Sequence, residues 1–280
     1  MNIRLRPITF LIVFLIVSAV YILSPTIVTN IPVETLYLVF PVVAALVGVY
    51  ASGVYGIKSA NGRAQLLITA GLVIWAIAET VSYISDDYIT SDNLAPQTPD
   101  FIFLSAFPIL CAGIYQGYTT AGIKLKQVKR SLLIGVSLTS LVLTILVAYF
   151  GVYQAYDSSA DLLQNVVNIG YGIGDLVLVI ASMLTILVAN EYGNGKLASF
   201  WKTMGAGFFV FLIGDILFYT MYGDLMAQDI KPYTYIELIW LAGYLLFTYA
   251  IIENYMHILS VQINIRIKLQ QRNQTNTDIK

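Results

Sequence analysis

The sequence predicts an all-α integral membrane protein with eight transmembrane helices, built as two parallel repeats of four helices. Hydrophobic residues make up 58% of the chain, charged residues only 11%, and the mean hydropathy is +0.76. A typical soluble domain has about 25% charged residues. A water-soluble fold of 280 residues cannot hide this much apolar surface, so most of the chain must lie in lipid.

Eight apolar stretches approach the roughly 20 residues that cross a hydrocarbon core of about 30 Å. The expected helices cover residues 8–25, 35–56, 66–85, 101–122, 132–153, 162–189, 204–222 and 235–258. Arg4 and Arg6 ahead of the first stretch also suit a signal peptide. The apolar run is longer than a usual signal segment, and Ser24-Pro25 is a poor cleavage site. We therefore expect the first helix to stay uncleaved.

Basic residues predict the orientation of these helices. Fourteen of the fifteen Lys and Arg residues fall on one side of the predicted membrane, and only Lys231 falls on the other. The positive-inside rule makes the basic side cytoplasmic, which places both termini in the cytoplasm of a cell-membrane protein. The opposite loops are acidic, with Asp86, Asp87, Asp92, Asp100, Asp157, Asp161, Asp224 and Asp229. A net charge of −1 argues against nucleic acid as a partner.

Similar features recur in the two halves of the chain at a nearly constant offset. The matched features are the turns at 61–63 and 194–196, the acids Glu79 and Asp215, and the acids Asp100 and Glu237. Four helices separate the halves, so the predicted repeats share one orientation. The first repeat would span residues 1–123, the second 124–258, and a polar cytoplasmic tail 259–280. Chance matching of polar residues is the alternative.

Acidic residues inside spans are the candidate site. Each costs roughly 2.5–3.5 kcal/mol at membrane depth, so they seldom face lipid. We predict that Glu79 and Asp215 face each other across the repeat interface in the outer half, with Asp100 and Glu237 lining the mouth. The first and fifth stretches carry no acid and are expected at the periphery.

Tyrosines gather at the outer ends of the same helices, and Tyr83 and Tyr219 lie nearest to the predicted acid site. Carboxylates beside aromatic faces suit a small polar or cationic ligand in an outward-opening cavity. The alternative is an aromatic belt at the membrane interface, with the carboxylates satisfied by hydroxyl and amide groups. Asp175, deeper in the sixth stretch, completes the predicted ligand-binding set.

Residues 172–175 read Gly-Ile-Gly-Asp, which resembles the catalytic loop of presenilin-type and prepilin-type intramembrane aspartyl proteases. Such enzymes need a second aspartate at the same depth, because the two carboxyls share one proton. Asp215 is the candidate, but helix rise predicts Asp175 about 8–10 Å nearer the cytoplasm. The Pro-Ala-Leu element is absent, and the glycines also suit close helix packing. A protease or a small transporter therefore stays an alternative to a binding protein.

No cofactor, metal site or catalytic residue is predicted. One cysteine, Cys111, and one histidine, His257, cannot build a cysteine cluster or a multi-histidine metal centre. No Walker, Rossmann or nucleophile-elbow pattern occurs.

The segment after the eighth stretch alternates apolar and polar residues from Val261 to Leu269, which has the period of a strand. It also places apolar residues at helical spacing, at Ile258, Val261, Ile265 and Leu269. We predict that the last helix continues and presents this stripe to the membrane surface or to a cytoplasmic partner. A frayed polar end is the alternative.

Several short patterns together resemble the multi-helix membrane input domains that precede GGDEF diguanylate cyclase and some histidine kinase domains. The patterns are Trp75–Glu79, Pro99–Leu104 with Phe107-Pro108, Gly174–Leu176, Ile213–Tyr219 and Glu237–Tyr244. The resemblance implies sensing or ligand binding, with no known chemistry in the membrane part. Only the short segment 259–280 follows the eighth stretch, so signalling is expected to pass through a separate partner.

Overall fold

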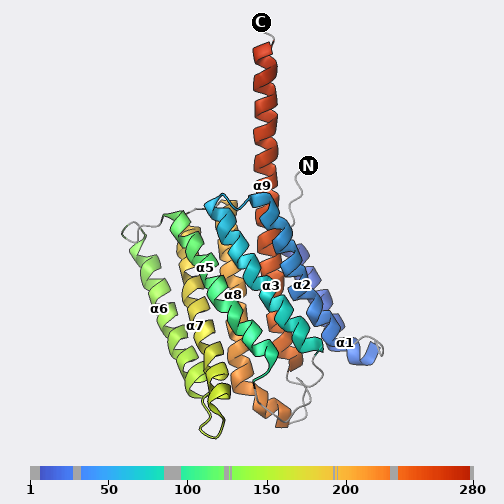
Figure 1. The fold of residues 1–280 in the computed structure, drawn as a ribbon, viewed down its shortest axis with the longest axis vertical. Coiled ribbons are helices and arrows are strands. Elements are labelled where there is room, and N and C mark those ends of the chain that lie inside the picture. Colours follow the sequence, from blue (N-terminus) through green and yellow to red (C-terminus); the bar gives the residue numbers. More distant parts are fainter. Residues whose placement is uncertain are drawn as a thin grey trace.

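The structure, a computed structural model, describes residues 7–27, 33–84, 96–122, 126, 128–191, 193, 195–227 and 233–277, and the regular elements in these ranges are all helical (Figure 1). The helices are α1 (Pro7–Ile27), α2 (Val33–Tyr55), α3 (Ala60–Ile84), α5 (Thr98–Ala121), α6 (Arg130–Val147), η2 (Ala148–Tyr153), α7 (Leu162–Glu191), α8 (Lys196–Ala227) and α9 (Tyr233–Thr277).

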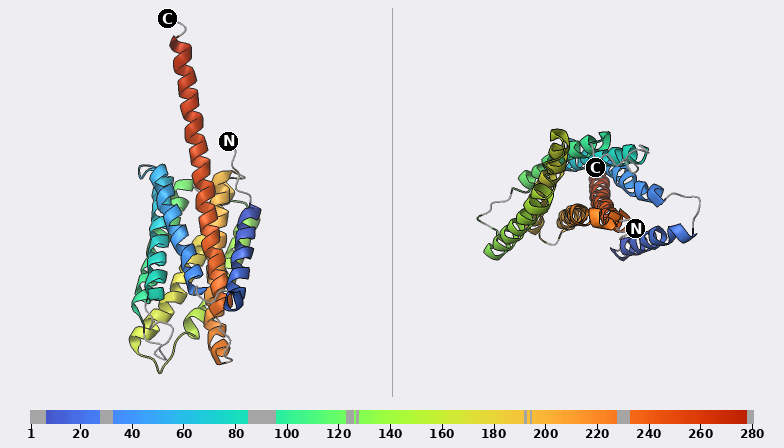
Figure 2. Two further views of the ribbon diagram at one scale, coloured as in Figure 1. Left: turned by 90° about the vertical axis from the view of Figure 1, so that its right-hand side faces the viewer. Right: turned by 90° about the horizontal axis from the view of Figure 1, so that it is seen from below.

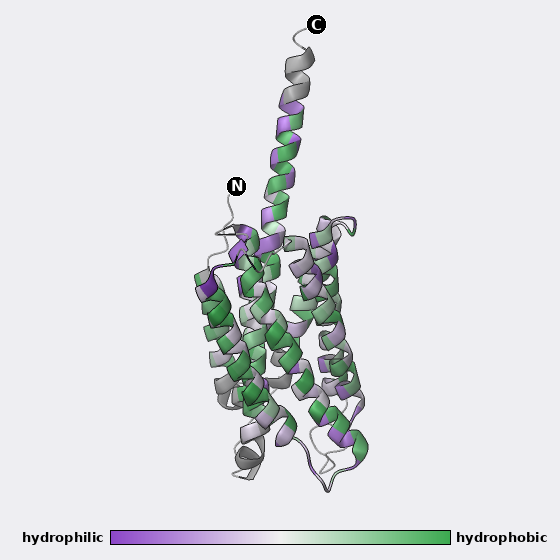
Figure 3. Cartoon of the chain, turned by 90° about the vertical axis from the view of Figure 1, so that its left-hand side faces the viewer, coloured by the Kyte–Doolittle hydropathy of each residue, from purple (hydrophilic) through white to green (hydrophobic). Residues whose placement is uncertain are grey.

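Seven helices are long and apolar enough over their described residues to cross a membrane, and α1 adds a shorter apolar stretch at Ile8–Val20. Helices satisfy every backbone polar group internally, which is what a lipid environment requires. Hydrophobic residues cover the sides of the bundle, and hydrophilic residues gather toward its ends (Figure 3). The predicted class, an all-α multi-pass membrane protein, is therefore confirmed.

Six helices form a closed ring in the order α2, α3, α5, α7, α8 and α9, with α9 packing back on α2 (Figure 2). Helix α1 lies against α9 and α2, and α6 lies against α7, both outside this ring. Both helices carry no acid along their whole length, although the span of α2, a ring helix, also carries none between Leu38 and Tyr55. Their position fits the expectation that acid-free helices are peripheral, because a helix that faces lipid on most sides can carry few charges.

The two ends of the bundle differ in charge. The basic end carries the turns between α2 and α3, α5 and α6, and α7 and α8, with exposed bases at Lys58, Arg63, Lys126, Lys129, Arg130, Lys196 and Lys202. The opposite, acidic end carries the loop 154–161, where the side chain of Asn165 bonds the backbone N–H and C=O of Asp157 at 2.9 and 2.8 Å. Hydrogen bonds from the Ser159 hydroxyl and N–H lower the pKa of the Asp157 carboxyl.

Several helix boundaries differ from the predicted ranges: α3 begins at Ala60 instead of residue 66, and α8 ends at Ala227 instead of residue 222. Helix α8 begins at Lys196 instead of residue 204, because Lys196 is tied to Glu253 of α9 by an ion pair of 2.6 Å and so stays helical outside the apolar span. Helix α9 runs without interruption through Thr277, so the last helix continues past residue 258, as predicted for the alternating segment. The helical interpretation of the alternating segment holds, and the strand interpretation is wrong.

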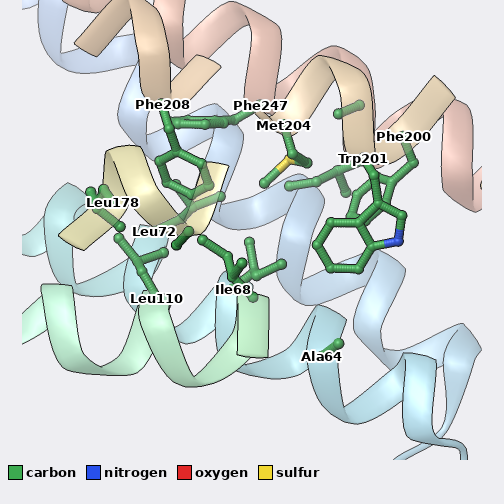
Figure 4. Packing of buried hydrophobic residues seen from close by; sticks show 14 of the residues in the cluster. Ala64, Ile68, Leu72, Leu110, Leu178, Phe200, Trp201, Met204, Phe208 and Phe247 are labelled. Carbon is green, nitrogen blue, oxygen red and sulfur yellow. The ribbon is translucent and has the colours of Figure 1, made fainter. Parts of the chain in front are cut away.

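A packed apolar layer fills the middle of the ring (Figure 4). Side chains from α3, α5, α8 and α9 meet there and are at most 2% exposed: Ile68, Leu72, Leu110, Met204, Phe208 and Phe247. Trp201 packs beside them toward the basic end, where Gly117 has no side chain to obstruct its ring. The segments of α3, α8 and α9 that carry the candidate site lie one to two turns from this layer, toward the acidic end. The packing of the layer fixes the positions of these segments relative to one another.

Candidate functional site

Asp215 on α8 meets Trp240 on α9, whose indole N–H donates a hydrogen bond of 2.9 Å to the carboxyl Oδ1. The preceding residue, Gly214, makes this possible because a side chain there would collide with the Trp240 indole. The Gly-Asp pair therefore has two linked roles: Gly214 leaves space for the Trp240 indole, and Asp215 accepts the hydrogen bond from the indole N–H.

Glu79 on α3 meets Tyr244 on the same face of α9, one turn further along. The Tyr244 hydroxyl donates a hydrogen bond of 3.0 Å to Glu79 Oε1, and the tyrosine is 0% exposed. One turn before the two acids, Trp75 and Phe211 stack with ring centroids 5.0 Å apart. Residues four apart share a helix face. Glu79 and Asp215 consequently both face the ring interior, and Tyr244 lies within electrostatic reach of each.

Asp175 on α7 is 4% exposed, and its carboxyl lies close enough to the carboxyl of Asp215 for the two groups to interact electrostatically. The expected depth difference of about 8–10 Å between them is wrong. The turn between α7 and α8 lies at residues 192–195, and α8 begins eight residues earlier than predicted. Counted from this turn at about 1.5 Å per residue, Asp175 lies about 24 Å away and Asp215 about 28 Å away. Side chains span the remaining difference.

We call Glu79, Asp175, Asp215, Trp240 and Tyr244 the acid cluster. Its members come from α3, α7, α8 and α9, four of the six ring helices. Two carboxylates this close in a membrane interior repel each other when both are ionised, so the proximity of Asp175 and Asp215 favours a proton on one of them. Among the described residues, neither carboxyl is paired with Lys, Arg or His. A proton shared by the two carboxyls would remove negative charge from the membrane interior, as a basic side chain does elsewhere.

Two other predicted acids lie at the edge of this cluster or apart from it. Asp100 caps α5 by accepting the Gln97 backbone N–H at 2.8 Å, and it also accepts the Tyr171 hydroxyl at 3.0 Å. Glu237 lies one turn before Trp240 on the same face of α9, and its buried Oε2 has no hydrogen-bond partner among the described residues.

The two predicted tyrosines are less informative. Tyr83 follows Glu79 by one turn of α3 and is 39% exposed. The side chain of Tyr219 lies outside the described residues.

The glycines of the Gly-Ile-Gly-Asp pattern have packing roles. A Cβ at Gly172 would overlap the backbone of Gly151 in η2, and a Cβ at Gly174 would come within 2.8 Å of the Phe107 ring. Their role is close helix approach, which the sequence left open beside the protease interpretation.

Sequence reasoning did not assign a role to Trp240, Tyr244 or Tyr171, which supply three of the hydrogen bonds to acids. A usable signal was present, because Glu237, Trp240 and Tyr244 have the spacing of one helix face. A polar aromatic residue on the same face as an intramembrane acid is a candidate donor to another acid, since a buried indole N–H or phenol O–H needs a partner.

Comparison with known proteins gives no significant match to a family model, to a curated protein or to a solved structure.

We expect Tyr244→Phe to lower the free energy of unfolding by about 1–3 kcal/mol, because the ring is retained while Glu79 loses a buried donor. Chemical unfolding in mixed micelles, followed by circular dichroism, measures this difference. The matched control is Tyr115→Phe on α5, where the tyrosine is 66% exposed. Equal effects of the two substitutions would contradict a structural role for the Tyr244 hydroxyl.

Proposed function

We propose that the protein is a multi-pass membrane sensor that binds a proton or a small cation at the acid cluster and passes the change to the cytoplasm through α9. One observation carries this proposal: α9 supplies Trp240 and Tyr244 to the acid cluster, and the same unbroken helix extends to Thr277, beyond the bundle. The sequence resemblance to membrane input domains supports the same assignment.

The chemistry of the acid cluster supports a very small ligand. Three carboxyls attract positive charge, but the aromatic rings beside them are packed against one another, since Phe211 also meets Tyr244 edge to face at 4.8 Å. A proton or a small inorganic cation fits between such groups without displacing a ring. Binding would change the bonding between Asp175 and Asp215, and hence the position of Trp240 on α9.

The packed apolar layer favours a sensor over a transporter. Some buried polar side chains at the depth of this layer are hydroxyls that bond to backbone carbonyls of their own helix, at Ser182, Thr185 and Thr248. The six residues that fill the ring there are all apolar. A path for ions through the ring would have to open this layer, whereas a signal along α9 passes it as a rigid helix.

Orientation and internal symmetry belong to the same proposal. The basic end would face the cytoplasm by the positive-inside rule, which leaves the acid cluster in the outer half. Equivalent contacts support the two-repeat hypothesis: Gly71 faces Leu110 in the first half, and Gly207 faces Phe247 in the second. The two glycines are separated in sequence by nearly the same number of residues as the two side chains that they face. Trp75 and Phe211 stack on each other and match at that offset too, so they would lie near the symmetry axis.

A distance measurement across the basic end tests the proposal. The full chain, with Cys111→Ser to remove its cysteine, would carry spin labels at Ile263→Cys on α9 and at Lys126→Cys between α5 and α6. Pulsed electron resonance in lipid nanodiscs would record the distance as pH is raised, and separately as Na⁺, K⁺ or choline is added. We expect a shift in the wild-type background for protons or for one inorganic cation, and none for choline.

The variant Asp175→Asn should abolish this shift, because its amide N–H replaces the shared proton with one that does not titrate. Asp157→Asn in the exposed loop is the control and should leave the shift intact. Other titratable groups lie on α7 itself or on the helices packed around the pair, namely Glu79, Asp100, Tyr171, Glu237 and Tyr244. A shift that survives in Asp175→Asn would assign the response to one of these groups, and the absence of any shift would reject the sensor.

An intramembrane aspartyl protease is the second candidate, favoured by the contact between the Asp175 and Asp215 carboxyls. A protease would cleave a transmembrane peptide substrate in proteoliposomes, and Asp175→Asn and Asp215→Asn would each abolish cleavage while Glu79→Gln would not. Equal activity of the wild type and Asp175→Asn would reject this candidate.

A further inference from the structure

The apolar stripe beyond the bundle continues the face by which α9 packs into the ring. Tyr244 and Ile251 are 0% exposed inside the ring, and Ile258 and Ile265 follow at the same heptad interval. A heptad interval drifts by only about 20° around a helix. Ile258, Val261, Ile265 and Leu269 are therefore on the side of α9 that faces the rest of the bundle.

This stripe stands above the basic end. Helix α9 projects beyond the other helices (Figure 1), and its far end lies within the outline of the bundle in the view along its axis (Figure 2). Gln262 at the base of the extension donates a hydrogen bond to the Val54 carbonyl of α2 at 3.4 Å. The extension and the basic end thus form two walls of one corner, which we call the basic corner.

The two walls have complementary character. One wall offers apolar side chains, with Val261, Ile265 and Leu269 between 42% and 55% exposed. The other wall offers the exposed bases of the basic end, and Arg266 and Lys268 add positive charge on the extension itself. At this end, Glu253 is already paired with Lys196 at 2.6 Å, and exposed Glu191 is outnumbered by the bases. An occupant of the basic corner therefore needs an apolar strip bordered by acidic side chains.

The geometry disfavours the two other kinds of occupant. A second copy in the same membrane would hold its α9 parallel to this one. If that helix lay against the stripe, its membrane part would occupy the space of the ring helices that pack on Ile251 and Tyr244. The lipid surface is disfavoured because Glu253 pairs with Lys196 at the start of α8, and Val261 to Leu269 lie about 12 to 24 Å further along α9 at about 1.5 Å per residue. A soluble protein is not limited in either way.

We propose that an acidic cytoplasmic protein docks in the basic corner, placing an apolar strip on Ile258, Val261, Ile265 and Leu269 and acidic side chains against the bases of the basic end. This inference rests on the proposed role of α9 as the output helix and names the class of partner that reads it. A movement of α9 that started at Trp240 would open or close this corner directly, because the stripe and the two donors to the acid cluster are on one helix face.

Photo-crosslinking in intact cells tests the docking without any change of ligand. Benzoylphenylalanine would replace Ile265 on the stripe or, as a matched control, Ile263 on the opposite side of α9; the two isoleucines are 52% and 54% exposed. We expect an adduct with a soluble protein of acidic isoelectric point from position 265 and none from position 263. Lys58→Glu combined with Lys202→Glu should abolish the adduct, since both side chains are exposed at the basic end.

Every other outcome of the crosslinking experiment would contradict the docking proposal. An adduct of twice the mass of the chain would assign the stripe to a second copy, and a lipid adduct would assign it to the membrane. Equal adducts at 263 and 265, no adduct at 265, or an adduct that survives the charge reversals would each reject the basic corner. The spin-label experiment is independent of these results, so failure of docking and failure of the proposed sensor are distinguishable.

Discussion

Gly172→Ala is expected to destabilise the protein by about 3 kcal/mol or more, at the upper end of what overpacking usually costs. The added methyl would overlap the backbone carbonyl carbon and oxygen of Gly151. A flexible side chain could move aside, but these atoms belong to η2, a π-helical turn that continues α6. The clash can be relieved only by moving α7 away from α6 and η2, which breaks their packing.

Gly135→Ala on α6 is the control for this substitution, because a methyl there meets no atom within 4 Å. It should be neutral, or stabilising by up to about 1 kcal/mol from helix propensity. Denaturant unfolding of the two variants in the same micelles gives the comparison. Similar stability of both variants would contradict the close approach of α7 to η2.

Asp175→Leu should cost about 3 kcal/mol, whereas Asp175→Asn should cost less than about 1 kcal/mol. Leucine removes the partner of Asp215 in the ring interior, leaving a buried carboxyl that keeps the hydrogen bond from the Trp240 indole N–H alone among the described side chains. Asparagine keeps the shape and still offers an N–H to the Asp215 carboxyl. The difference between the variants therefore measures how much Asp215 depends on a polar partner at position 175.

Unfolding of both variants, with circular dichroism as the readout, gives these values independently of any function. Asp175→Leu as stable as Asp175→Asn would mean that the two carboxyls do not depend on each other. The same pair of variants then separates two roles, because Asp175→Asn should keep the fold while losing the proposed response to protons or cations.

Composition and spacing were enough to predict the membrane class and the course of the helices. A span is recognised from about 20 consecutive residues, since their transfer to lipid depends on local hydrophobicity. The peripheral positions of α1 and α6 agree with the absence of acids in their spans, but α2, whose span also lacks acids, lies in the ring. Glu79, Asp175 and Asp215 stood out by the same reasoning, because an acid at membrane depth needs an interior position.

The partners of these acids were decided by tertiary structure alone. Trp240 is 25 residues from Asp215, and Tyr244 is 165 residues from Glu79, so no local pattern joins donor to acceptor. The contact of Asp175 with Asp215 depended on how α7 and α8 pack against each other after the turn between them, which no local pattern specifies. Hydrophobicity determines how deep a residue can lie, but it carries no information about which helix stands beside it. Side-chain packing supplies that, through glycines such as Gly214 that let one particular neighbour approach.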